Sequence, residues 1–429
     1  MICAEIPVVL PLLNETQSFK PVETTSFIEI NNPGFWICLF FLIIIFFYCC
    51  YLIYFSFTVK TKKQKFDYFP IVSVLVDAKN ASNTIRRRIE NLLKQNYPKN
   101  KYEIIVYDRN SKDNTEVICR EYEKQGKIKY IRGDERYEIK GPLLDLAIEK
   151  LAKGEILLLT DPDVISEKNW ILEMVQPFKD PKVGVVAGTV HCGNYYKGFF
   201  PLMRAVEDEW RFVAPMLRNS DTVFPVGANQ ALRREAWEQT KFGNKILDDL
   251  DITTRIIDKG WKSVGVSATG VEEEVETLQQ YWKQRTRWYR VNVGEYFGKT
   301  KFWKKFIEAL PHSIQLIMAA LMIIFVFSLF SKTLWALVLL DFILLNVAMV
   351  IAFIRTKTGV NFIPYISLYL IIDTLFFVVT VFYVQIVGRF VNVTKEAWPS
   401  LQVGTYHSGS ELKTWFFKFG RKVKDYTKM

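Results

Sequence analysis

The sequence predicts an α/β domain with a Rossmann-like, mostly parallel sheet, joined to a transmembrane helical region. Between about residues 70 and 265, short β-rich runs alternate with helical patterns. That alternation is typical of βαβ units around a parallel sheet. Half of the 429 residues are hydrophobic, and many of them cluster in long runs on either side of this segment. Such clusters are typical of membrane-spanning helices.

The first apolar run, residues 35–57, carries no charge and is long enough to cross a bilayer as a helix. It begins too late for a cleaved signal peptide, so we predict a permanent transmembrane helix. Glutamates precede the run, and Lys60, Lys62, Lys63 and Lys65 follow it. The positive-inside rule therefore predicts a short extracytoplasmic segment at 1–34 and a cytoplasmic domain after the helix.

The predicted catalytic domain covers residues 66–295. Its expected strands are the runs IVSVLV, YEIIVY, IKYIR, EILLLT and VGVVAG, with helical spacing between them. In such sheets ligands gather at the carboxyl ends of the strands. Functional residues are therefore expected directly after these runs.

The segment after the domain returns to the membrane. The aromatic and basic stretch Phe302–Phe306 predicts an interfacial amphipathic segment at 296–311, and apolar runs at 312–390 predict about three transmembrane helices. Three crossings would place the tail, 391–429, outside, although its lysines and arginines favour the inside, so one run is a candidate for incomplete crossing. Asp341 and Asp373 interrupt two runs and predict either a polar path or a hydrogen bond between helices.

Composition excludes several functional classes. The net charge is +11, but the basic residues gather beside apolar runs, which favours anionic membrane lipids over nucleic acid as the partner. The six cysteines include no C-x-x-C pair, and the three histidines are scattered. Neither a zinc site nor a disulfide framework is expected.

Two carboxylates directly follow the run EILLLT, in the segment Asp161-Pro162-Asp163. Hard oxygen ligands at the end of a buried strand suit Mg²⁺ or Mn²⁺ bridging to a diphosphate. Because Asp and Pro are common turn residues, a simple polar turn is the alternative.

Three further segments carry polar groups at comparable places. Asp108 ends the run YEIIVYD, where a carboxylate can accept a base N–H. Asp248, Asp249 and Asp251 lie together, and repulsion between close carboxylates raises their pKa, which suits a base. Taken by itself, this segment is more typical of an acidic helix N-terminus. The segment QRTRW, residues 284–288, offers an amide, a guanidinium and a flat ring on neighbouring helix faces, which suit a phosphate and a sugar. The alternative is a basic helix that flanks the membrane.

In this order the segments resemble the family 2 glycosyltransferases with a GT-A fold, in particular the branch with cellulose, chitin and hyaluronan synthases and ceramide glucosyltransferases. The resemblance covers about residues 70–288 and rests on Asp108, the DPD segment, the DDLD segment at 248–251 and Q-x-x-R-W. It implies an inverting, metal-dependent hexosyltransferase that uses a nucleotide-sugar donor, with UDP-sugars expected.

The resemblance also implies roles for individual residues. Asp249 would be the catalytic base, and Asp161 and Asp163 would bind Mn²⁺ or Mg²⁺. The donor would be bound by Asp108, Lys140, Asp161, Gln284 and Arg287, and the acceptor by Trp288 and Asp248.

Several positions depart from the family pattern. Asp77 stands where relatives usually have proline, Ala81 where they have glutamate, and Arg109 where they have a second acid. Asp145 replaces a frequent asparagine, and Val275 replaces a common proline. A uridine donor is less secure for this reason.

Three functions remain open at this stage. The first is processive synthesis of a polysaccharide or glycan at the cell membrane by a multi-pass protein, with a homo-oligomer as a possible way to widen the export path. The second is single transfer to a membrane lipid. The third is a catalytically inactive sugar-binding membrane protein, which the departures at Asp77, Ala81 and Arg109 alone support.

Overall fold

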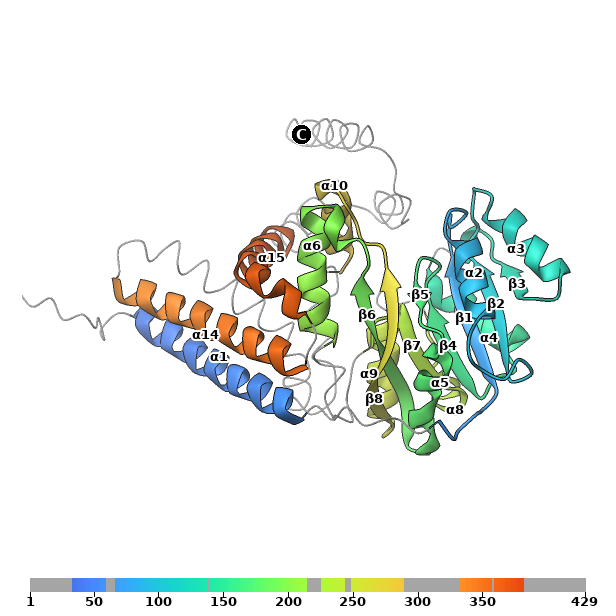
Figure 1. The fold of residues 1–429 in the computed structure, drawn as a ribbon, viewed down its shortest axis with the longest axis horizontal. Helices are drawn as coiled ribbons and strands as arrows, with labels where there is room; N and C mark the ends of the chain where they lie inside the picture. Colours follow the sequence, from blue (N-terminus) through green and yellow to red (C-terminus); the bar gives the residue numbers. More distant parts are fainter. Residues whose placement is uncertain are drawn as a thin grey trace, which may run out of the picture.

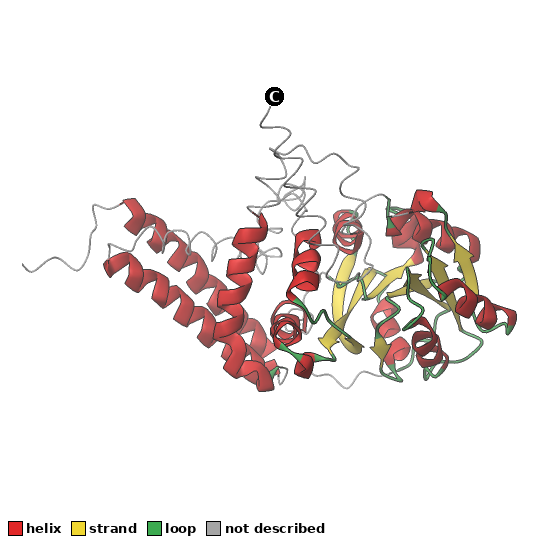
Figure 2. Ribbon diagram, turned by 90° about the horizontal axis from the view of Figure 1, so that it is seen from above, coloured by secondary structure: helices red, strands yellow, loops and turns green. Residues whose placement is uncertain are grey.

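The structure is a computed structural model that describes residues 33–58, 66–137, 139–213, 225–243, 248–288, 332–356 and 359–381. One body is a sheet with helices on both faces, and the other is a group of apolar helices beside it (Figures 1 and 2). Helix α6, Phe199–Glu207, lies between the two bodies in Figure 1. The predicted α/β domain and the apolar helical region therefore appear as neighbouring parts of one molecule.

The sheet has eight strands in the order β3-β2-β1-β4-β7-β6-β8-β5. The neighbours β3, β2, β1 and β4 are parallel, as the sequence predicts, whereas β7 is antiparallel to β4 and β6, and β5 is antiparallel to β8. The sheet is therefore mixed. The strands are β1 Val72–Ala78, β2 Tyr102–Asp108, β3 Lys129–Arg132, β4 Ile156–Thr160, β5 Ile165–Ser166, β6 Val183–Cys192, β7 Asn229–Arg233 and β8 Lys262–Glu272.

The central strands are buried on both faces, which explains their nearly continuous apolar sequences. Val74 and Val76 of β1 pack on the side of α2, α3 and α5, and Leu75 packs on the side of α4, α8 and α9. The alternation follows from the period of two in a strand. The helices are α2 Ile85–Leu93, α3 Thr115–Lys124, α4 Lys140–Leu151, α5 Trp170–Val175, α8 Arg234–Glu238 and α9 Asp248–Asp258.

The strand order changes direction at β1. From β1 the chain goes outward to β2 and then β3, and it returns to place β4 on the other side of β1. Nucleotides bind at such switch points, outside the carboxyl ends of parallel strands. The segments after β1, β2 and β4 are therefore the part of the fold in which a ligand is expected.

The apolar body contains α1, Pro33–Thr58, α14, Lys332–Thr356, and α15, Ile366–Val381. Within the described residues, one helical stretch, Ala336–Arg355, is long and apolar enough to cross a membrane, and Phe35–Tyr51 and Val360–Phe376 are shorter apolar stretches. The segments predicted at 296–311 and 391–429, and the apolar run 313–330, lie outside the described residues. A multi-pass topology stays a prediction.

Helix α6 connects the apolar body to the sheet. Helices α1 and α14 lie side by side (Figure 1). Met203 and Val206 of α6 are fully buried in one apolar cluster with Ile45 of α1 and Met349 of α14. The face of α6 that meets the apolar helices is therefore hydrophobic, while the same helix also buries two charged residues, Arg204 and Glu207.

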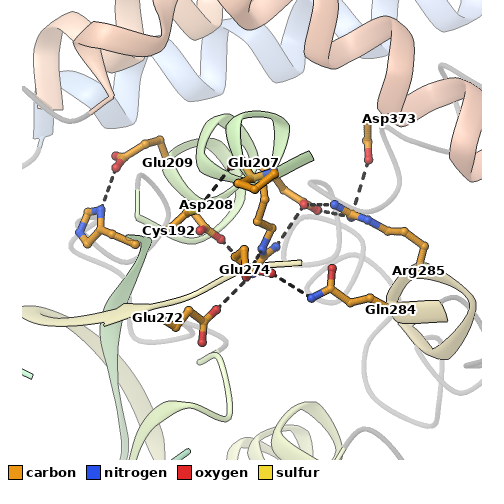
Figure 3. A network of polar contacts seen from close by, with 12 residues as sticks. Cys192, Glu207, Asp208, Glu209, Glu272, Glu274, Gln284, Arg285 and Asp373 are labelled. Atoms are coloured by element: carbon orange, nitrogen blue, oxygen red, sulfur yellow. Dashed lines mark hydrogen bonds and ion pairs between the residues drawn. The ribbon is translucent and has the colours of Figure 1, made fainter. Parts of the chain in front are cut away.

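A buried ion pair joins α6 to helix α10, Leu278–Trp288. Arg285 of α10 donates two hydrogen bonds to Glu207 of α6, and both side chains are fully buried (Figure 3). The Arg285 guanidinium also lies 3.8 Å from Asp373 of α15. Asp373 thus faces the protein interior, where a charged group in an apolar helix is expected to find a partner.

A second arginine extends this network toward the sheet. Arg204 pairs with Glu207 at 3.1 Å, with Asp208 at 2.9 Å and with Glu274 at 2.7 Å. Burial and neighbouring acids hold the pKa of Asp208 well above its usual range. For Glu274, burial acts in the same direction, but the positive charge of Arg204 keeps its pKa low. Arg204 is therefore the shared cation of three buried acids.

We expect Arg285→Met to destabilise the protein by about 3 kcal/mol, because it leaves buried carboxylates without their cation. Thermal unfolding of the detergent-solubilised full chain measures this loss as a lower midpoint. Arg86→Met is the matched control, because it breaks an exposed pair with Glu121 and should shift the midpoint far less. Equal shifts for the two variants would contradict the role of Arg285 as the joint between α6, α10 and α15.

Candidate active site

The DPD segment lies where the sequence predicts it, in the turn after β4. Lys140, at the first position of α4, lies with its Nζ 3.3 Å from Asp161 Oδ1. Asp161 is about one-third exposed and Lys140 less so. The N-terminus of α4 adds partial positive charge at the same place. This edge of the sheet therefore offers two carboxylates and a lysine to a ligand.

A buried arginine holds the DPD turn from both ends. Arg88 of α2 donates to Thr160 Oγ1, just before the turn, at 2.6 Å and to Ser166 Oγ, just after it, at 2.9 Å. It is fully buried and stacks on Trp170 at 5.2 Å. Burial lowers the pKa of Arg88 to about 9, although the charges of Asp161 and Asp163 oppose the shift. No motif in the sequence marks Arg88, although its place on the buried stripe of α2 is a visible signal.

Asp163 carries the strongest electrostatic signal of the DPD turn. Burial and then the negative charge of Asp161 raise its pKa to about 7, and Glu274 adds a smaller contribution. Part of the Asp163 population is therefore protonated at neutral pH. A cation next to this pair would relieve the repulsion and favour the ionised form.

Asp249 lies at the second position of α9, at the N-terminal end of the helix. Its Oδ1 accepts a hydrogen bond from Leu250 N at 2.8 Å, and its Oδ2 accepts one from Gly227 N at 2.9 Å. Burial raises its pKa, the nearby Lys140 acts to lower it, and Asp161 acts to raise it. Asp249, Lys140 and Asp161 thus belong to one electrostatic environment. The side chain of Asp248 lies outside the described residues.

Asp145 fixes the segment that leads toward α9. One carboxylate oxygen accepts the Trp237 indole N–H at 2.8 Å, and both lie within hydrogen-bond distance of Phe242 N. The backbone N–H of Gly243 donates to the same carboxylate at 3.2 Å. An acid at this position, where relatives often have asparagine, therefore accepts several donors at once.

Asp108 lies at the end of β2 as predicted, but its side chain is fully buried. One oxygen accepts the backbone N–H and the hydroxyl of Ser111, at 2.8 and 2.7 Å, and the other accepts the Tyr130 hydroxyl at 2.8 Å. This carboxylate holds the turn after β2. The predicted contact with a nucleobase stays a prediction.

Two departures from the family pattern meet in space. Arg109, directly after β2, donates from Nε to Asp77 Oδ1 at 2.8 Å and from Nη2 to Asp77 Oδ2 at 2.9 Å. Burial acts to raise the pKa of Asp77, but Arg109 and Lys140 hold it below its usual range. In the sequence Asp77 and Arg109 are separate substitutions, whereas in the structure they form one bidentate pair.

The QRTRW segment forms the last part of α10. Gln284 donates from Nε2 to Glu274 at 3.0 Å, so within the described residues its amide N–H group already has an acceptor (Figure 3). The side chains of Arg287 and Trp288 lie outside the described residues. Their expected contacts with pyrophosphate and acceptor stay predictions.

The donor atoms at the DPD turn fit a hard divalent cation. The two close carboxylates are hard oxygen ligands, and their mutual repulsion helps to raise the pKa of Asp163. Among the described residues no group of three or more His, Cys, Asp and Glu is placed to hold a metal. A cation bound here would thus need further ligands, and Mg²⁺ typically takes substrate phosphates and water beside one or two carboxylates.

Comparisons with known proteins agree with this geometry. Residues 73–240 match the model of glycosyl transferase family 2. A beta-monoglucosyldiacylglycerol synthase of Trichormus variabilis is 31% identical over 250 residues, which are 56% of this chain and 52% of the relative. A poly-beta-1,6-N-acetyl-D-glucosamine synthase of Staphylococcus epidermidis is 25% identical over 54% of this chain and 56% of its own. The chain spans about half the length of these curated relatives.

A solved structure extends the likeness beyond the matched segment. The mannosyltransferase PcManGT from Pyrobaculum calidifontis, in complex with GDP-Man and Mn²⁺, matches 80% of this chain and 99% of its own with a TM-score of 0.53. At 19% identity this likeness shows the fold. With the mixed sheet, the DPD turn and the match over residues 73–240, the chain contains a glycosyl transferase family 2 segment and has a GT-A-like fold.

Proposed function

We propose that this protein is a membrane-bound, inverting glycosyltransferase that moves a sugar from a nucleotide-sugar donor to a lipid acceptor on the cytoplasmic side of the cell membrane. The observation that carries this proposal is the shared environment of Lys140, Asp161, Asp163 and Asp249 at the switch point of the sheet. A cation, a phosphate ligand and a base are the groups that sugar transfer from a diphosphate requires.

The donor diphosphate would lie between the DPD turn and the N-terminus of α4. Lys140 and the first backbone N–H groups of α4 suit phosphate oxygens. Asp161 and Asp163 would hold Mn²⁺ or Mg²⁺, which when bound neutralises charge on the departing diphosphate. Gln284 and Arg287 remain candidates for the pyrophosphate. Lys140 would exchange its contact with Asp161 for one with a phosphate oxygen by a change of its side-chain rotamer.

Asp249 would act as the general base. Its carboxylate takes the proton of the acceptor hydroxyl while the oxygen attacks the anomeric carbon. The bond between that carbon and the diphosphate oxygen breaks, and the nucleoside diphosphate leaves with the bonding electrons. Attack from the face opposite the leaving group inverts the configuration. The raised pKa of Asp249 favours this role, because a base with a pKa closer to neutral accepts a proton more readily.

A lipid acceptor is favoured by the apolar helices and by the relatives. Exposed apolar side chains cover α1 and α14, among them Phe40, Phe47 and Leu339, and such surfaces suit lipid contact. A glycolipid synthase is among the relatives that match. A polysaccharide acceptor is the second candidate, because a poly-N-acetylglucosamine synthase also matches. Homo-oligomer formation stays a prediction.

The direct test is a transfer assay with the purified full chain, Mn²⁺ and a panel of UDP- and GDP-sugars. We expect free nucleoside diphosphate together with a labelled lipid when diacylglycerol vesicles are supplied. A labelled polymer without vesicles would instead favour the polysaccharide acceptor. Release of no nucleotide from any donor would overturn the proposed function.

We expect Asp249→Asn to reduce transfer by about 10² to 10⁴, the contribution of a positioned base. Donor binding, measured by calorimetry, should be largely retained, because the amide keeps the size of the side chain. Asp251→Asn is the matched control, since this neighbour pairs with Arg255 at 2.7 Å on the same helix. Near-normal turnover of Asp249→Asn would refute the assignment of the base.

Binding of Mn²⁺ should strengthen as pH rises. The pKa of Asp163 is about 7, and a carboxylate must lose its proton to bind a metal. The affinity should therefore rise by up to about tenfold per pH unit below 7 and level off above 8. Calorimetric titration with Mn²⁺ and UDP from pH 5.5 to 8.5 measures the slope, and Asp163→Asn should weaken binding and flatten it. A flat profile for the unaltered protein would contradict the role of Asp163.

A further inference from the structure

The DPD turn and the turn that holds Asp249 lie at the ends of two neighbouring strands. Strand β7 is antiparallel to β4, and its first residue, Asn229, lies opposite Thr160, the last residue of β4. The turn at residues 226–229 precedes β7 and is closed by a hydrogen bond from Asn229 N to Val226 O at 2.9 Å. Its Gly227 N–H donates to Asp249. We call it the base-holding turn, and it lies beside the DPD turn at one edge of the sheet.

The buried side-chain amide of Asn229 joins the base-holding turn to three other elements. Its Nδ2 donates to Thr189 O of β6 at 2.8 Å and to Ala268 O of β8 at 2.9 Å. Its Oδ1 accepts the indole N–H of Trp170 of α5 at 2.8 Å. A Cβ at Gly188 would come within 2.4 Å of Asn229 Nδ2, so β6 admits the amide only where it has a glycine. Both N–H groups and the oxygen of the amide are therefore used, which fixes its orientation.

Trp170 continues the chain of contacts toward the DPD turn. Its side chain is buried, and the Arg88 guanidinium lies 5.2 Å from the centre of its ring. Arg88 in turn binds Thr160 and Ser166, on either side of the DPD turn. A continuous set of buried contacts therefore runs from the DPD turn through Arg88 and Trp170 to Asn229.

A separate apolar contact joins the same two turns. Val164, which directly follows Asp163, is buried in one small cluster with Ala228 of the base-holding turn and Val190 of β6. A Cβ at Gly270 of β8 would come within 2.9 Å of Val164 Cγ1, so this cluster is closely packed. Hydrogen bonds and apolar packing thus both act on the separation between the DPD turn and the base-holding turn.

We propose that Trp170 and Asn229 are positioning residues that fix the separation between the DPD turn and Asp249. This inference rests on the proposed function. In that reaction the DPD turn holds the departing diphosphate and Asp249 takes the proton of the acceptor, and both act on one anomeric carbon. Reaction rates depend steeply on such alignment. Donor binding uses the DPD turn and not Asp249, so loss of the indole–amide bond lowers turnover more than donor affinity.

Trp170→Phe tests this directly, because it removes the indole N–H and keeps an aromatic ring beside Arg88. In the transfer assay with the purified full chain and Mn²⁺, kcat should fall at least about tenfold. The affinity for UDP or GDP, whichever binds better in calorimetry, should change little. An unchanged kcat in Trp170→Phe would overturn the inference.

Tyr97→Phe is the matched control. The buried Tyr97 donates its hydroxyl to Pro70 O at 2.7 Å, ahead of β1 and at the edge of the sheet away from the site. Each variant loses one buried hydrogen bond, so the thermal midpoint should fall in both. Only Trp170→Phe should lose turnover. Equal losses of kcat in the two variants would show a merely structural effect and would also overturn the inference.

Val164→Ala tests the same separation through the apolar contact and keeps the indole–amide bond. It should lower kcat in the same direction, because the two turns lose part of their packing. This variant decides the question if Trp170→Phe does not fold, and a normal kcat would then count against the inference. Failure of the unaltered protein to transfer any sugar would instead remove the proposed function. A loss confined to the variants leaves that function in place.

Discussion

The balance of charge at the carboxyl edge of the sheet is the constraint on which the site depends. Asp161, Asp163 and Asp249 lie in one electrostatic environment, and burial raises the pKa of Asp163 and of Asp249. Lys140 and the buried Arg88 supply positive charge from the α4 side and the α2 side. Burial and the charge of Asp161 nevertheless keep the pKa of Asp163 above its usual range. A negatively charged diphosphate would worsen the repulsion unless a cation came with it, which links donor binding to metal binding.

The same electrostatic field reaches the apolar helices. Burial and the neighbouring acids Glu274 and Asp163 raise the pKa of Glu272 at the end of β8. Glu274 in turn binds Gln284 and Arg204, and Arg204 binds Glu207, the partner of Arg285. One continuous set of buried ionisable groups therefore extends from the DPD turn to α10 and α15.

The sequence predicts β1, β2, β3, β4, β6 and the position of the DPD turn, because period-two burial and polar residues after apolar runs are local features, but it does not predict β5, β7 and β8. It does not predict what each aspartate contacts. Asp108 lies on the same strand face as Val106 and therefore points under α3. The alternation of side chains along β2 can be read from the sequence, but which helix covers each face cannot. The pairing of Asp77 with Arg109 needs the register between β1 and β2, in which Ala78 lies opposite Asp108.

In the Q-x-x-R-W segment of α10, too, the sequence does not predict which side chain makes which contact. Spacing directs attention to Gln284 and Arg287, yet the residue between them, Arg285, forms the fully buried contact with Glu207 and Asp373. Asp373 lies in a run that sequence alone assigns to the membrane, so only the packing of α15 on α10 reveals why a carboxylate belongs there.

This contact also relates the proposed acceptor to the fold. Helix α6 packs on α1 and α14 through its apolar face and on Arg285 through Glu207. The described sheet domain is therefore packed against the apolar helices through α6. An acceptor hydroxyl that is itself confined to the membrane surface can meet Asp249 only if the position of Asp249 relative to that surface is fixed, because a misplacement of about 1 Å can cost about 10² in rate. The buried ion pairs between α6, α10 and α15 thus help to fix the geometry that the proposed reaction at Asp249 requires.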